Sequence, residues 1–171
     1  MHNLWIQNLV TIVETHRYLG YVILYFAMVI EGEVFLIIAG TLAQLHVLNV
    51  GYTFFVALAG VLTGDSLWYF LGVELKKKKF ARNAILKAEK TVTLLLPHFK
   101  ARPFNSIFLS KFIYGANHAT LIVSGALGVA YQTFFEAEFI ASLLWTISFI
   151  SLGYFFGATA NDVMYIDNYS V

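Results

Sequence analysis

Two long apolar stretches constrain this chain more than any other feature of its sequence. Residues 52–75 and 135–157 each exceed the roughly 20 apolar residues that cross the hydrocarbon core of a bilayer. Charged residues make up only 12% of the chain, against about 25% in a typical soluble domain. A soluble helical protein would need a charged surface that this composition does not supply. The sequence therefore predicts an all-α integral membrane protein.

Basic residues are concentrated in the segment that follows the first of these stretches. It contains nine of the eleven lysines and arginines: Lys76, Lys77, Lys78, Lys79, Arg82, Lys87, Lys90, Lys100 and Arg102. Because positively charged loops stay on the cytoplasmic side, residues 76–102 are predicted to be cytoplasmic. Apolar positions recur among them, which favours an amphipathic surface helix over 76–103. Membrane topology explains this charge, so no nucleic-acid partner is expected.

Residues 18–47 form an apolar segment that is interrupted by Glu31-Gly32-Glu33. Residues two apart in a helix lie about 200° apart around its axis, so the two glutamates fit a turn better than a continuous helix. The apolar arms on either side, near residues 18–30 and 34–46, have about 13 residues each and are too short to span a bilayer. We therefore expect a re-entrant hairpin with the glutamates at its tip and Gly32 in its turn. Two short spans joined by an ordinary loop are the alternative.

A second interrupted segment covers residues 104–130. Its polar break reads "KFIYGANHA", from Lys111 to Ala119, and includes His118. A second re-entrant hairpin is expected here, with Gly115 in its turn. Irregular backbone at membrane depth must be buried in protein or line a wet cavity, so both tips are candidate sites.

The two halves of the chain resemble each other at an offset of 85 positions. Residues 36–72 align without a gap to residues 121–157. Identical pairs include Leu36/Leu121, Ile37/Ile122, Gly40/Gly125, Tyr69/Tyr154 and Gly72/Gly157. This predicts a duplication, with coincidence between two apolar segments as the alternative. Because one span separates the two halves, the second copy would be inverted, an architecture common among secondary transporters.

Hairpins that enter from opposite faces would bring their tips together near the midplane. Acidic Glu31 and Glu33 would then meet basic Lys111 and His118, which would offset the cost of charge in the membrane. The broken helices would also direct backbone dipoles at this volume, and helix N-termini favour an anion such as phosphate.

Three carboxylates in the long apolar stretches, Asp65, Glu136 and Glu138, need an explanation of their own. Asp65 is either a structural partner of Lys111 or His118 or a proton-carrying group. Glu136 and Glu138 are expected to be hydrated at the membrane interface, at the start of the last span. No metal-binding or nucleophile motif is found, so neither a cofactor nor enzymatic activity is expected.

Four segments together resemble the DedA family, whose members share the VTT, or SNARE-associated, domain. They read "EGEVFLIIAGTLA", "GDSLWYFLG", "FLSKFIYGANHATLIVSGALG" and "LLWTISFISLGYFFG". The resemblance covers about residues 20–157. It implies two opposed re-entrant hairpins with flanking spans, and lipid transport. Bacterial members are linked to the return of undecaprenyl phosphate or phosphatidylethanolamine across the inner membrane, with proton-motive force invoked, and eukaryotic relatives to phospholipid scrambling.

This chain matches the family motifs at some positions and departs from them at others. Glu33 and Asp65 match acidic positions, although the proline that precedes the first motif is missing. In the second hairpin the family pattern is Arg-Phe-x-Pro-Gly-x-Arg, and here Lys111, Tyr114 and Asn117 replace its arginines and proline. Lysine retains the charge without the bidentate fork of arginine, and asparagine loses the charge.

These observations predict a multi-pass protein of the bacterial inner membrane that moves a phosphate-headgroup lipid between leaflets. The expected layout is an interfacial segment 1–17, repeat 1 at 18–75 (hairpin 18–47, span 52–75), the cytoplasmic segment 76–103, repeat 2 at 104–157 (hairpin 104–130, span 135–157) and a polar tail 158–171. The expected acidic, proton-binding residues are Glu31, Glu33 and Asp65, and the expected headgroup ligands are Lys111, Asn117 and His118. A proton-coupled small-solute or ion transporter and a non-transporting membrane scaffold are the alternatives.

Overall fold

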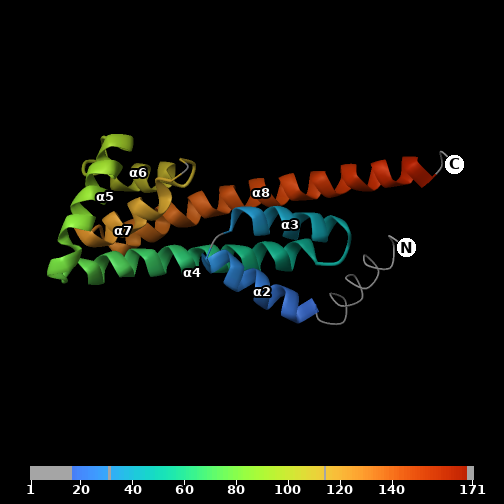
Figure 1. Ribbon diagram of the computed structural model, residues 1–171, viewed down its shortest axis with the longest axis horizontal. Helices are drawn as coiled ribbons and strands as arrows, with labels where there is room; N and C mark the ends of the chain where they lie inside the picture. The colour runs from blue at the N-terminus through green and yellow to red at the C-terminus, as the bar shows by residue number, and fades with distance from the viewer. Residues whose placement is uncertain (1–16, 31, 114, 169–171) are drawn as a thin grey trace. The chain divides into compact units, whose positions relative to one another are not determined.

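Helices account for most of the computed structural model, which describes residues 17–30, 32–113 and 115–168 and has no strand within them (Figure 1). The helices are α2 (Arg17–Ile30), α3 (Glu33–Gln44), α4 (Val50–Lys76), the short 3-10 helix η1 (Lys79–Ala81), α5 (Arg82–Leu95), α6 (Pro103–Ser110), α7 (Asn117–Leu127) and α8 (Tyr131–Asn168). They form two compact units. One comprises the described residues up to Val61 and from Thr146 onward, and the other is Leu62–Trp145.

Two helices are long and apolar enough to cross a membrane. They are α4, with 27 residues, and the 29-residue Tyr131–Thr159 part of α8. At 1.5 Å per residue each is about 40 Å long, more than the ~30 Å hydrocarbon core. Fewer than half of the residues in their apolar windows are buried inside the protein, which leaves apolar surface for lipid. The all-helical class is thus confirmed. The helix α8 continues beyond the expected span, so the polar stretch from residue 158 begins as helix.

Within the first unit, α2 packs against α3. These helices have 14 and 12 residues, or about 21 and 18 Å, so neither can cross the hydrocarbon core alone. They match the two short arms predicted on either side of the glutamates. Their re-entry into a membrane stays a prediction. The predicted interfacial segment 1–17 lies outside the described residues except for Arg17.

A close helix crossing in this unit is made by glycines of α3 and α8. A Cβ on Gly153 would collide with the carbonyl oxygen of Ile37, and a Cβ on Gly40 would collide with that of Ile150. The Thr41 hydroxyl donates a 2.9 Å hydrogen bond to the carbonyl of Gly153. Small residues on both helices therefore let the two backbones touch, as in many membrane helix pairs.

The second unit contains a crossing of the same kind between α7 and α4. A Cβ on Gly125 would collide with the carbonyl oxygen of Tyr69, and one on Gly72 would collide with that of Ile122. The 85-position offset relates Ile37 and Gly40 of α3 to Ile122 and Gly125 of α7. Each of these Ile-x-x-Gly pairs makes close backbone contacts within its own unit. The inverted orientation of the second repeat relative to the first remains a prediction.

The apolar core of the second unit lies where α5 and α6 pack against α7 (Figure 1). It is formed by Tyr69, Val92, Leu96, Phe99, Ile107, Leu121, Val123, Phe134 and Ala137. The predicted amphipathic segment contributes Val92, Leu96 and Phe99 to this core, whereas Leu86, Leu94 and Leu95 remain exposed. The helix α5 thus docks on α7 along a narrow stripe and keeps its basic residues outside.

Candidate functional site

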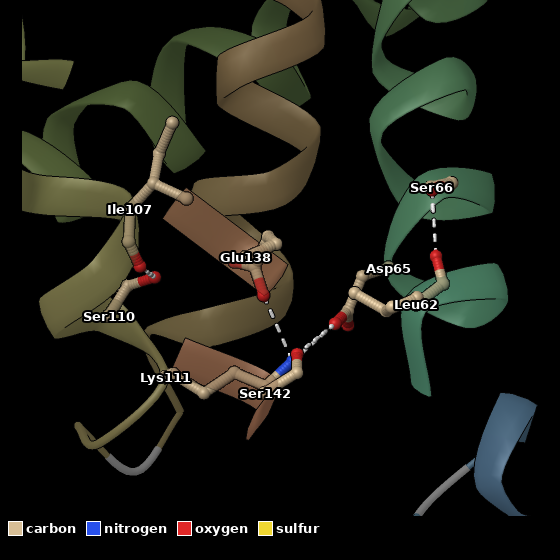
Figure 2. Close-up of polar contacts among 8 residues, drawn as sticks. All are labelled: Leu62, Asp65, Ser66, Ile107, Ser110, Lys111, Glu138 and Ser142. Atoms are coloured by element: carbon tan, nitrogen blue, oxygen red, sulfur yellow. Dashed lines mark hydrogen bonds and ion pairs between the residues drawn. The ribbon is translucent and has the colours of Figure 1, made fainter. Parts of the chain in front are cut away.

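A buried lysine lies directly after α6 in the second unit. The helix α6 ends at Ser110, whose hydroxyl donates a 2.7 Å hydrogen bond back to the carbonyl of Ile107. The next residue, Lys111, turns its side chain inward, where only 3% of it is exposed (Figure 2). A lysine this deeply buried must be paired, because an isolated ammonium loses its hydration without compensation.

Two carboxylates, from α4 and α8, provide that pairing. The Nζ of Lys111 donates hydrogen bonds to Oδ2 of Asp65 and, over 3.0 Å, to Oε2 of Glu138 (Figure 2). The Asp65 side chain is 9% exposed and that of Glu138 is 1% exposed. We call Lys111, Asp65 and Glu138 the ionic cluster. It connects the tip of the second helix pair to both long helices within one unit.

The spacing of residues on α8 explains how this helix places several side chains beside the ionic cluster. Glu138, Ser142 and Trp145 are four and three residues apart and therefore share one face. The Ser142 hydroxyl lies 3.5 Å from Oδ2 of Asp65, and the Trp145 ring centroid lies 6.0 Å from Nζ of Lys111. On α4 the neighbouring Ser66 hydroxyl bonds its own helix, at the carbonyl of Leu62 (Figure 2).

The charges of the ionic cluster do not balance. One ammonium faces two carboxylates, so the fully ionised cluster carries one excess negative charge. The second carboxylate oxygen of Glu138, Oε1, is buried and has no hydrogen-bond partner among the described residues. A proton on this oxygen would neutralise the cluster and turn an unsatisfied acceptor into a donor. The arrangement is therefore suited to binding a proton or a hydrogen-bond donor of a ligand.

The position of Glu138 corrects the sequence-based expectation. It was expected to be hydrated at the membrane interface, and this is wrong, because the side chain is buried and paired with Lys111. Glu136 does lie exposed, where it accepts a 3.0 Å hydrogen bond from Nε2 of Gln132. The spacing of Glu138, Ser142 and Trp145 on one helical face is visible in the sequence, but only the structure shows that this face is turned toward Lys111.

The other residues predicted in the second hairpin lie around the start of α7. Asn117 has a buried Oδ1 with no hydrogen-bond partner among the described residues, and His118 is exposed with its ring edge-on to Trp68 at 5.2 Å. Neither is among the described partners of Lys111. Gly115 has φ +77°, a left-handed conformation that favours glycine.

The acidic residues predicted in the first hairpin belong to the other unit. Glu33 is exposed in the first turn of α3, where the helix dipole favours a carboxylate. Gly32 precedes it with an ordinary φ of −102°, so this turn uses no conformation reserved for glycine. Glu31 lies outside the described residues. The meeting of the two hairpin tips remains a prediction.

Among the side chains that the structure describes, no group of three or more histidine, aspartate or glutamate residues is arranged to hold a metal ion. The two carboxylates of the ionic cluster are instead directed at an ammonium group.

Comparison with known proteins supplies a family. A family model described as "VTT domain" matches residues 30–155. An "Uncharacterized membrane protein" of Buchnera aphidicola subsp. Baizongia pistaciae (strain Bp) is 26% identical over 144 residues, which is 81% of this chain and 54% of the relative. The chain thus matches about half the length of that relative. No solved structure matches the chain.

Proposed function

Since the chain belongs to the VTT-domain family, we propose that it is a lipid translocase that moves a phosphate-headgroup lipid between membrane leaflets. The chain is a membrane protein with two helices long enough to cross a bilayer. Undecaprenyl phosphate and phospholipids are the candidate substrates. The bacterial inner membrane, with residues 76–102 on the cytoplasmic side, is the proposed location.

The ionic cluster is the observation that carries this proposal. Charged residues are rare in membrane-embedded segments, where they usually belong to substrate or ion pathways. Here the carboxylates of Asp65 on α4 and Glu138 on α8 meet the ammonium of Lys111, where the chain between α6 and α7 is not helical. A protein that only needed packing at this point could have used apolar residues at comparable stability.

The charge balance of the cluster provides a mechanism for proton coupling. As described, both carboxylates hold Lys111, so its ammonium is not free for a phosphate. Protonation of Glu138 or Asp65 weakens this hold and lets the ammonium turn to a phosphate oxygen. Deprotonation then recaptures Lys111 and displaces the headgroup. Phosphate binding and proton binding would therefore be linked, and each would promote the other.

The predicted tip residues complete the proposed pathway. Glu31 and Glu33 would supply further proton-binding groups from the first hairpin. Asn117 and His118 would donate hydrogen bonds to the headgroup beside Lys111. The unsatisfied, buried Oδ1 of Asn117 supports a role for this side chain toward a ligand hydroxyl or ammonium.

Reconstitution tests the proposal directly. Purified protein in vesicles should make a fluorescent phospholipid, or a labelled undecaprenyl phosphate, accessible to a membrane-impermeant reagent faster than in protein-free vesicles. A pH gradient should change this rate for the wild-type chain. Failure to move either lipid, with or without the gradient, would contradict the proposal. Saturable uptake of a solute without lipid movement would indicate the small-solute transporter instead.

Matched substitutions connect the activity to the cluster. Glu138→Gln should weaken the response to the pH gradient, because it removes one proton-binding oxygen of the cluster without changing the side-chain volume. Glu136→Gln, on the same helix but exposed, is the control and should behave as wild type. If both substitutions leave the lipid flux and its pH response unchanged, the cluster has a structural role only.

A further inference from the structure

A groove lies on the second unit, and Lys111 is not among the described residues that line it. One wall is residues 95–98, at the end of α5 and just after it, and the other is α6 with the residues that flank it; its volume is about 400 Å³. This is within the ~300–1,000 Å³ of typical small-molecule sites. The described residues that line the groove all fall between Leu95 and Ile113, within the second unit.

One end of the groove is positively charged. Arg102, His98 and Asn105 line it at the N-terminal end of α6, and all three side chains are exposed. Within the described part of the chain Arg102 forms no ion pair, whereas nearby Lys100 is paired with Glu89 at 2.7 Å. Neither aspartate nor glutamate is among the described residues that line the groove. This end is therefore available to an anion, for which a guanidinium provides a bidentate contact.

The other end of the groove is apolar. Leu109 and Phe112 line it and are 50% and 51% exposed, with Leu95 (43% exposed) on the opposite wall. Leu109 is seven residues beyond Arg102, or about 10 Å farther along the helix axis. The groove thus has a cationic end and an apolar end. The distance between them is comparable to that between the headgroup and the upper acyl chain of a lipid.

We propose that this groove binds one anionic lipid. Its phosphate would accept hydrogen bonds from Arg102 and His98, and its upper acyl chain would cover Leu109 and Phe112. A soluble anion would use the first end only and leave the apolar end exposed to water. The predicted cytoplasmic position of residues 76–102 also places Arg102 at the surface where anionic lipids attract basic residues.

The groove adjoins the ionic cluster through α6. Lys111 lies between Leu109 and Phe112 in the sequence but turns its side chain to Asp65 and Glu138. A lipid held in the groove would therefore have its chain beside the interrupted helix pair. This inference deepens the proposed function, on which it rests for its role as a loading site, but lipid binding can be measured without translocation.

A single thiol can report on occupancy, because the chain contains no cysteine. Asn105→Cys, labelled with a fluorophore, would be placed in phosphatidylcholine nanodiscs with increasing amounts of nitroxide-labelled phosphatidylglycerol or nitroxide-labelled phosphatidylcholine. We expect the anionic quencher to act at an about tenfold lower mole fraction, the scale of a charge-assisted contact. The same label at Leu86→Cys, exposed on α5 outside the groove, should show a smaller preference.

Charge substitutions then assign the preference to the groove. Arg102→Gln with His98→Gln should remove it, whereas Arg82→Gln, which removes a charge from the same basic segment outside the groove, should leave it intact. Equal quenching by the two lipids at position 105, or an equal effect of Arg82→Gln, would overturn the inference. Displacement of the quencher by inorganic phosphate would also overturn it and indicate a site for a soluble anion.

The two proposals fail in different ways. Selective quenching that persists in a protein without lipid flux would remove the translocase proposal and leave the groove as a lipid-binding site. Lipid flux without selective quenching would remove the groove and leave the translocase proposal. Glu138→Gln provides an internal check, since it should alter the pH response of flux and leave quenching at position 105 unchanged.

Discussion

The Nζ of Lys111 lies 3.0 Å from Oε2 of Glu138, and this contact joins the residue after α6 to the first third of the apolar span of α8, Tyr131–Thr159. Asp65 of α4 accepts a hydrogen bond from the same ammonium. Both carboxylates depend on one lysine, so the three side chains should respond to mutation as a unit.

Removal of the lysine should be strongly destabilising. Lys111→Met would leave two buried carboxylates without a cation, at a cost of about 3–5 kcal/mol in the free energy of unfolding. Denaturation in detergent micelles measures this cost. As a control, Lys77→Met removes an exposed lysine paired with Glu74 and should cost no more than about 1 kcal/mol.

Neutralising the carboxylates should rescue the lysine variant. In the triple variant Lys111→Met, Asp65→Asn and Glu138→Gln, no unpaired charge remains buried. We expect it to recover most of the stability lost by Lys111→Met alone, because residues in one network couple by about 0.5–3 kcal/mol. Additive losses from the three substitutions would show that the side chains act independently and would contradict the cluster.

Glu138→Gln should leave stability near the wild-type value while it removes the dependence of stability on protonation of this group. The substitution leaves Lys111 and Asp65 as a balanced pair and eliminates the excess negative charge. The midpoint of thermal unfolding, measured across a pH series in detergent, checks this. A wild-type pH profile in the variant would contradict the proton-binding role, and Glu136→Gln should retain the wild-type profile.

The glycine crossings should not tolerate a methyl group. In Gly40→Ala and Gly125→Ala the new Cβ meets backbone carbonyls, which cannot move aside as a side-chain end can. Each should lower the unfolding free energy by about 1–3 kcal/mol, the usual cost of overpacking. Gly20→Ala is the control, since its Cβ would lie an ordinary 3.7 Å from the Leu48 side chain. It should be neutral or stabilising, and an equal loss there would contradict the prediction.

The basic segment should be accessible from the cytoplasm. Leu86→Cys introduces a single thiol on the exposed face of α5 in a chain without cysteine. A membrane-impermeant maleimide should label it in inverted membrane vesicles and spare it in intact spheroplasts, as the positive-inside rule requires. Labelling in intact spheroplasts would reverse the predicted topology.

The helices and their breaks were accessible from the sequence because they depend on local properties. The apolar length of 52–75 predicts a single long helix, and the structure has α4 over Val50–Lys76. The close spacing of Glu31 and Glu33 predicted that no helix runs through them, and α3 begins at Glu33. In each case hydropathy and the helical repeat act over neighbouring residues, so no knowledge of the packing is needed.

The ionic cluster and the groove required the tertiary structure. The sequence proposed Asp65 as one partner of Lys111, but it could not select Glu138 over Glu136, because only packing decides which face of α8 is turned to the lysine. The groove likewise depends on the approach of residues 95–98 to α6. Hydropathy determined by itself which segments are helical and apolar. Which charges meet is decided by the tertiary structure, because the partners of Lys111 lie 27 and 46 positions away in the sequence. The free energy of burying a charge depends on such partners, and the local sequence does not specify them.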